Sequence, residues 1–325
     1  MKKLFLLAAA ALALASCSND DNQTGNWDGR LRLSSGVAMQ SRAAHGLDEV
    51  IAKDETVWLY IDNDKSTPEQ VYGKQLTATG SNGFTGGDEM YFPAESSKIS
   101  LYAFHINEGT STTMTADAYP TGLLTHQIEQ DQTSGESKSG YAKSDLLYAT
   151  CTVSREDAKT NTGKITLPFV HLLSKIEVVL VQGKGEPDIT KMEILNTRLQ
   201  VSFTPGKAAT SITLSAVDGN TDSNPIVIDC GTTSGEAASN TENDANKVLN
   251  EAVIVPQTLN DKTPFIRLTL QDGGILVYKL EEETTFVSGY KYRYTITANL
   301  TDLSVSSSIT PWTSVTNKPG TATME

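Results

Sequence analysis

The stretch LPFVHLLSKIEVVLVQ, residues 167–182, decides the fold class of this 325-residue chain. Its second half places apolar side chains on both faces of an extended chain. One face carries Ile176, Val178 and Leu180, and the other carries Val179 and Val181. A strand that is apolar on both faces is buried on both, and its β-branched residues favour a strand over a helix. We therefore predict a central β-strand here that opens the second domain of the chain.

Short strand patterns, separated by clusters of Gly, Asn, Ser and Thr, continue on both sides of this stretch. The candidate strands before it are residues 30–39, 57–61, 71–78, 98–106 and 145–153. Those after it are residues 189–203, 211–216, 225–229, 251–257, 264–270, 275–280, 289–300 and 303–312. No convincing amphipathic helix interrupts them. The pattern predicts an all-β chain with one sandwich over residues 30–166 and a second over residues 167–325.

Length and composition agree with a two-domain protein and argue against nucleic acid as a partner. The length suits about two domains, by a prior of roughly 100–200 residues each. The formal net charge is -13, and no cluster of Lys or Arg offsets it, so the surface repels nucleic acid. Of the three cysteines, one belongs to the leader. Cys151 and Cys230 remain, and two cysteines make no disulfide framework.

The first 16 residues form a targeting segment. Two lysines precede an apolar core at residues 4–15, which is the anatomy of a signal peptide. Leu14-Ala15-Ser16-Cys17 then resembles the lipobox of bacterial lipoproteins, whose cysteine carries acyl chains. Each acyl methylene buried in a membrane contributes about 0.8 kcal/mol. We predict lipidation at Cys17 and a polar tether over residues 17–29, the alternative being an ordinary secretory leader with a chance cysteine.

Residues 30–39, RLRLSSGVAM, show the alternation of a half-buried strand. One face carries Leu31, Leu33, Val37 and Met39, interrupted by Ser35, and the other carries Arg30, Arg32 and Ser34. Ser41-Arg42-Ala43 follows in a small, polar segment that we expect to be exposed.

No set of residues in the sequence predicts catalysis, a cofactor or a metal. Ser174 adjoins Lys175, but neighbouring strand residues face opposite ways, so the two do not form a nucleophile with its base. The four histidines lack ligand spacing. Asp62-x-Asp64-x-Ser66 resembles the start of a calcium loop, but Thr67 stands where that loop requires glycine. We therefore predict a protein that is not an enzyme.

Several short motifs occur in a recognisable order along the chain. They are the lipobox, Ser41-Arg42-Ala43, Asp145-Leu146-Leu147-Tyr148-Ala149, Phe169-x-His171-x-x-Ser174-Lys175, Val255-Pro256-Gln257-Thr258-Leu259, Tyr290-x-Tyr292-x-Tyr294 and Ile309-Thr310-Pro311-Trp312. Together, over nearly the whole chain, they resemble the fimbrillin (Mfa-like) family of type V pilins. The resemblance implies two tandem transthyretin-like Greek-key β-sandwich domains. It also implies a structural, adhesion-supporting role in cell-surface fimbriae and export as an outer-membrane lipoprotein.

The resemblance further implies assembly by strand exchange. A protease that cuts between Arg42 and Ala43 would release residues 30–39 and empty the groove filled by Leu31, Leu33, Val37 and Met39. A strand from the next subunit would then refill this groove. The donor of this chain would lie within residues 303–325, with the apolar side chains Leu303, Val305, Ile309 and Val315. Because the tail is short and polar, stalk, tip and anchor positions all stay open.

The expected partners are other pilin subunits, the outer membrane through the lipid anchor, and the processing protease. A surface glycan-binding lipoprotein is the alternative, since three tryptophans and eleven tyrosines could present a platform for sugars. Most of these aromatic residues fall within strand patterns, which favours places in the core. Sugar binding without polymerisation would distinguish the alternative from a pilin.

Overall fold

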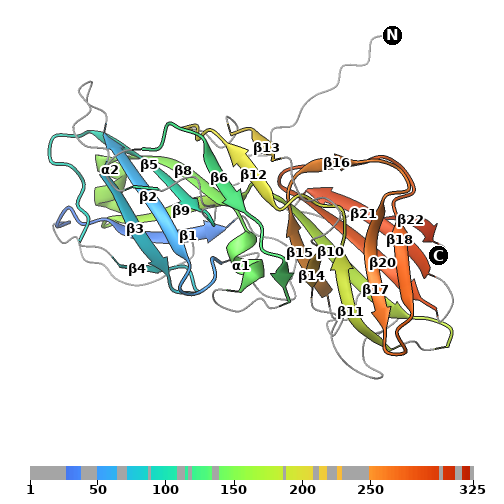
Figure 1. Ribbon diagram of the computed structural model, residues 1–325. Coiled ribbons are helices and arrows are strands. Elements are labelled where there is room, and N and C mark those ends of the chain that lie inside the picture. Colours follow the sequence, from blue (N-terminus) through green and yellow to red (C-terminus); the bar gives the residue numbers. More distant parts are fainter. Residues whose placement is uncertain are drawn as a thin grey trace, which may run out of the picture.

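The structure is a computed structural model, and the residues that it describes form mostly β-strands. It describes residues 27–37, 50–63, 72–86, 89–107, 114–115, 119–133, 139–185, 188–207, 212–217, 225–228, 249–299, 303–311 and 317–322. Figure 1 shows two β-rich lobes side by side, with the short helix α1 (Gly140–Ser144) between them. In the described part of the chain, no helix is long and apolar enough to span a membrane.

The first lobe is built on a seven-stranded sheet. Its order is β1 (Arg32–Val37), β9 (Lys164–His171), β8 (Leu147–Ser154), β5 (Lys98–His105), β2 (Thr56–Asn63), β3 (Tyr72–Ala78) and β4 (Phe84–Thr85). The neighbours pair antiparallel, except that β1 runs parallel to β9. The first strand of the described residues, β1, therefore forms one edge of this sheet.

Two five-stranded sheets build most of the second lobe. One has the order β15 (Leu249–Ile254), β10 (Ser174–Gln182), β20 (Tyr290–Ala298), β21 (Leu303–Pro311) and β22 (Asn317–Ala322). The other has the order β18 (Ile275–Lys279), β17 (Pro264–Leu270), β11 (Ile189–Ile194), β14 (Ile226–Ile228) and β7 (Asp131–Gln132). Since β7 comes from the first half of the sequence, the two halves share a sheet.

Smaller sheets complete the structure and join the halves again. One contains β13 (Leu214–Ala216), β12 (Gln200–Phe203) and β6 (Leu124–Gln127), and the other pairs β16 (Gln257–Leu259) with β19 (Thr284–Phe286). The first of these sheets joins β6 from the first half to β12 from the second. The largest apolar cluster likewise runs from Phe104 and Tyr148 of the seven-stranded sheet to Phe203, whose ring centroid is 6.4 Å from that of Phe104.

The stretch over residues 167–182 is two strands and not one. β9 ends at His171, and β10 begins at Ser174 in a different sheet. The side chains of β9 alternate between buried and exposed, whereas most of those of β10 are buried on both faces. The prediction of a central strand is thus confirmed for β10, which lies between β15 and β20. It is wrong for residues 167–171, because the apolar Leu172 and Leu173 hide the change of sheet in the sequence.

Two short helices were not expected from the sequence. α1 and α2 (Arg155–Thr160) have five and six residues, too few to show a helical apolar period. Each begins after a serine whose hydroxyl accepts a backbone N–H: Ser139 from Ala142, and Ser154 from Asp157. The division into two transthyretin-like domains stays a prediction beside this mostly β fold.

Candidate functional site

The edge strand β1 lies in a groove between two parts of the first lobe. On one side it pairs with β9, from Arg32 opposite Lys164 to Val37 opposite Phe169. On the other side it contacts residues 82–83 and 90–92, which we call the outer wall. Three backbone hydrogen bonds join the strand segment to this wall: Leu31 N–H to Met90 O at 2.8 Å, Ser35 N–H to Asn82 O at 2.9 Å, and Phe92 N–H to Gly29 O at 2.8 Å. We call the space between β9 and the outer wall the β1 groove.

The inward face of the strand carries the side chains that fill the β1 groove. Leu31, Ser35 and Val37 are buried, with exposed fractions of 4%, 2% and 5%. Leu33 is partly buried and packs on the same apolar cluster. The alternation predicted from the sequence is present in these residues, while Met39 lies outside the described part of the chain.

The outward face contributes mainly surface ion pairs. Arg32 is 3.1 Å from Asp28, and Arg30 is 2.8 Å from Glu89, all four side chains being about half exposed. Such exposed pairs contribute about 0–1 kcal/mol. The strand is therefore held mainly by backbone hydrogen bonds and by its inward side chains.

Gly163 allows the close approach of the chain that precedes β1. It has a φ of +80°, and a Cβ there would lie 1.9 Å from the carbonyl oxygen of Arg30. The Gly163 carbonyl in turn accepts the Arg32 N–H at 2.7 Å. A side chain at residue 163 would strain the backbone and displace the strand.

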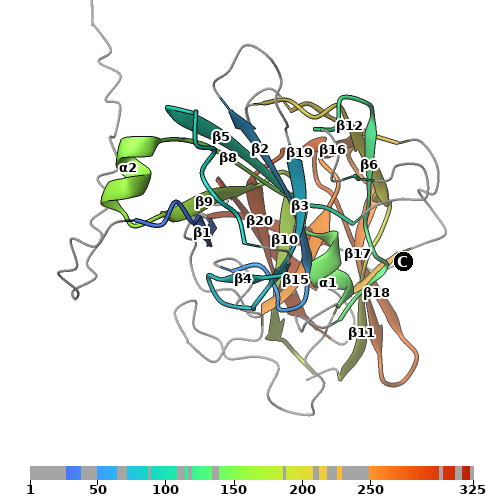
Figure 2. The ribbon, with the colours of Figure 1, turned by 90° about the vertical axis from the view of Figure 1, so that its left-hand side faces the viewer.

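Arg155, at the start of α2, holds residues 90–92 of the outer wall through Phe92 and the chain that directly follows it. The Arg155 guanidinium donates hydrogen bonds to the carbonyls of Ser96 at 2.9 Å and Ala94 at 2.7 Å, and to that of Pro93. Its central carbon also lies 4.7 Å from the ring centroid of Phe92. None of these contacts involves β1, so Arg155 holds the wall independently of the strand. Figure 2 shows α2, β1 and β9 on the same side of the molecule.

The expected donor residues in the C-terminal strands differ in their burial. Leu303 and Val305 are each 2% exposed and belong to the core of this chain, whereas Ile309 is 51% exposed. Val315 lies outside the described residues, as do Cys17, Arg42 and Ala43. Two of the four expected donor side chains thus stabilise their own subunit. The edge strand β22, which pairs with β21, follows these residues at the end of the same sheet.

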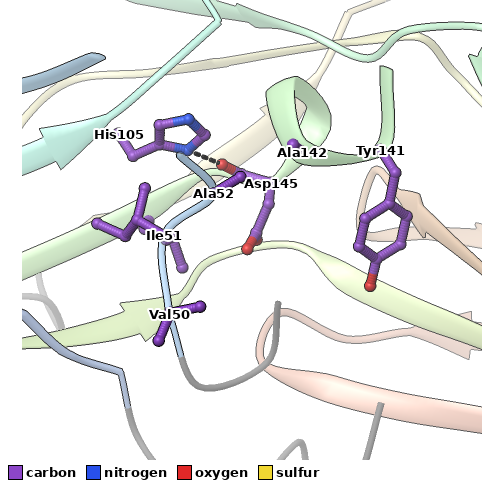
Figure 3. A pocket seen from close by; sticks show the side chains of 8 residues that line it. Val50, Ile51, Ala52, His105, Tyr141, Ala142 and Asp145 are labelled. Atoms are coloured by element: carbon purple, nitrogen blue, oxygen red, sulfur yellow. Dashed lines mark hydrogen bonds between the residues drawn. The ribbon is translucent and has the colours of Figure 1, made fainter. Parts of the chain in front are cut away.

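A small recess beside α1 contains the polar residues His105 and Asp145. Val50, Ile51 and Ala52 line it together with His105, Tyr141, Ala142, Asp145 and Leu147. Figure 3 shows the hydrogen bond from the His105 ring to the carbonyl of Asp145. The Asp145 carboxylate accepts a hydrogen bond from His171 Nδ1 at 3.0 Å. The lining offers no Ser, Thr, Cys or Lys nucleophile, so the recess does not make a catalytic set.

Electrostatics in this cluster favour a structural role. Burial acts to raise the pKa of Asp145, but the charges of His171, His105 and Lys175 outweigh it and hold that pKa below its usual value.

Among the described residues, no group of His, Cys, Asp and Glu could hold a metal ion. Burial raises the pKa of the Cys151 thiol to about 11, which keeps it protonated and unreactive. Ser174 donates its hydroxyl to the Val287 carbonyl and has no base beside it in the contacts described.

Sequence reasoning identified β1 and missed the residue that shapes its surroundings. The alternation of residues 30–39 was a sufficient signal for the strand. Nothing in the sequence indicated the role of Arg155, because only the tertiary fold brings its three carbonyl partners beside it.

Comparison with known proteins identifies the family of this chain. Residues 41–312 match the family described as Fimbrillin-like. A relative from Bacteroides uniformis, "Putative fimbrium subunit Fim1C", is 26% identical over 329 residues, which cover 96% of each protein.

Solved structures share the fold. A "putative cell adhesion protein" from Bacteroides uniformis ATCC 8492 has a TM-score of 0.56 at 20% identity, and one from Bacteroides ovatus ATCC 8483 has a TM-score of 0.57 at 15% identity. Each match covers 88% of this chain and 99% of the other. The family match, which spans most of the sequence, confirms the resemblance found in its motifs. The chain therefore belongs to the fimbrillin-like family, a family of structural proteins and not of enzymes.

Proposed function

We propose that this chain is a subunit of cell-surface fimbriae that is exported as a lipoprotein and joined to other subunits by strand exchange. The observation that carries the proposal is the position of β1: an edge strand whose inward side chains fill the β1 groove. The chain that follows it contains Arg42, the expected site of cleavage. A cut between Arg42 and Ala43 would end the covalent link between β1 and all other strands of the sheet, so that only non-covalent contacts would hold β1 in place.

The energetics of the groove support refilling by another strand. Burying an aliphatic side chain such as Leu31 or Val37 contributes about 1.5–3 kcal/mol. Each backbone hydrogen bond along β9 and the outer wall adds about 1 kcal/mol. Together these terms offset an association cost of roughly 4–15 kcal/mol, so an extended segment from another subunit can bind the empty β1 groove tightly.

The donor segment that agrees best with the structure is β22. It is an edge strand near the C-terminus, and the match to the family ends at residue 312, before β22 begins. Leu303 and Val305 would remain in their own core, so donation would begin after β21 and not at residue 303. Removal of the residues after Trp312 should shorten or abolish filaments without unfolding the subunit.

A pair of substitutions at Arg42 tests the proposal. Arg42→Ala removes the site for a trypsin-like protease and should leave full-length, monomeric subunits on the cell. Arg42→Lys is the matched control, because it keeps a cation that such a protease accepts, and it should still polymerise. Immunoblots of surface-sheared material report both processing and filament formation. Normal filaments from the Arg42→Ala variant would show that cleavage there is not the trigger.

A further inference from the structure

The inward face of β1 contains one side chain that does not suit its surroundings. Ser35 is 2% exposed, and its hydroxyl has no hydrogen-bond partner among the described residues. It stands opposite Leu167, which is fully buried, and its own strand places Leu33 and Val37 on either side of it along the same face. The hydroxyl therefore faces an apolar core.

The adjacent residue provides an internal comparison. The Ser34 hydroxyl faces outward and lies 3.1 Å from the Thr166 hydroxyl, within hydrogen-bond distance. Two serines in succession thus occupy opposite faces, and within the described part of the chain only the outward one has a hydrogen-bond partner. A buried hydroxyl without a partner destabilises the state that buries it.

We propose that Ser35 determines which strand the β1 groove prefers. It makes the chain's own strand a weaker occupant than a segment of another subunit that carries alanine or valine beside Leu167. This inference rests on the proposed function, because it assumes that β1 leaves and a second strand enters. The preferred segment has aliphatic side chains at the positions of Leu31, Leu33 and Val37, and an apolar residue in place of Ser35.

The neighbouring position narrows the preferred segment further. A Cβ on Gly36 would lie 2.8 Å from Cγ2 of Thr166. A donor strand in the same register would therefore carry glycine at this position, or Thr166 would have to rotate. When such a strand replaces β1, an apolar contact takes the place of the unsatisfied Ser35 hydroxyl. The free energy of the exchange therefore favours the incoming strand over β1.

The first test uses the full-length, uncut chain, in which β1 remains in place. Ser35→Ala removes the buried hydroxyl and should raise the melting temperature by about 2 °C or more. Ser34→Ala is the matched control, since it removes a hydroxyl that has a partner, and it should leave the melting temperature unchanged or lower it. A Ser35→Ala chain less stable than the wild type would overturn the proposal.

The second test measures occupancy of the groove directly. The chain is cut after Arg42, and labelled peptides with the sequence of residues 30–39 compete with its own strand. The peptide with the Ser35→Ala change should bind about tenfold more tightly than the wild-type peptide, and the Ser34→Ala peptide should not. Equal or weaker binding of the Ser35→Ala peptide would contradict the preference. If no peptide enters the cut chain, the proposed strand exchange itself fails, and the thermal test alone decides the role of Ser35.

Discussion

At the scale of single residues, the least expected feature is the charge buried in β10. Lys175 and Glu177 are fully buried, although most of the other side chains of the strand are apolar. Lys175 lies 3.0 Å from Glu251, and Glu177 lies 3.1 Å from Lys291 and 2.8 Å from Arg293. The sequence correctly indicated a strand buried on both faces. It could not indicate the ion pairs, because their partners come from β15 and β20, which only the fold brings beside β10.

His126 in β6 is a second buried polar residue with a fixed protonation state. Its Nδ1 accepts the Asn107 N–H at 3.0 Å, so its Nε2 carries the proton donated to the Ser144 carbonyl at 2.8 Å. Burial lowers the pKa of His126 to about 4, which outweighs the opposing effects of Ser144 and Asp145, and His105 lowers it further. The folded chain therefore keeps this ring neutral under mildly acidic conditions.

We predict that His126 makes stability depend on pH between 6.5 and 4. As the pH falls, the unfolded chain takes up this proton first, so the stabilisation present above pH 6.5 is lost towards pH 4. Between pH 7 and pH 5 the loss is about 2 kcal/mol. His126→Gln, whose amide can accept and donate but does not titrate, should reduce that loss in urea unfolding. An identical pH dependence in the two proteins would show that another group is responsible.

At the scale of elements, the strands with clear alternation were predictable, and three very short strands were not. β1, β2, β5, β17 and β20 fall within the residue ranges expected from the sequence or extend them by a residue or two. β4, β7 and β19 have only two or three residues, too few for a periodic pattern. The position of β1 in its groove also depends on the outer wall, and Arg155 of another element contacts this wall at Phe92.

Arg155→Ala should loosen the outer wall without disturbing the pairing of β1 with β9. The Leu31 amide, which donates to Met90 of the wall, and the Phe92 amide of the wall, which donates to Gly29, should then exchange hydrogen faster. The Arg32 amide, which donates to Gly163, should change little. Lys159→Ala, in the last turn of the same helix, is the control and should leave all three rates unchanged. Equal acceleration at all three amides would mean that Arg155 stabilises the whole lobe and not the wall.

At the scale of the whole molecule, the two lobes are more closely joined than two successive domains would be. β6 and β7 come from the first half of the sequence but pair with β12 and β14 of the second. Tyr119 and Tyr148 of the first half also donate hydrogen bonds to the Gly206 carbonyl. The periodicity of single strands carries no information about such long-range pairing, so the sequence predicted the class of fold and not this interleaving.

The central claim is that the subunit loses β1 when it enters a filament. Mass spectrometry of this chain in filaments sheared from the cell surface tests it most directly. Our account predicts a mature chain that begins at Ala43 and lacks residues 30–39, beside a cell-bound precursor that carries acyl chains on Cys17. A filament-borne chain that still contains residues 30–39 would contradict it.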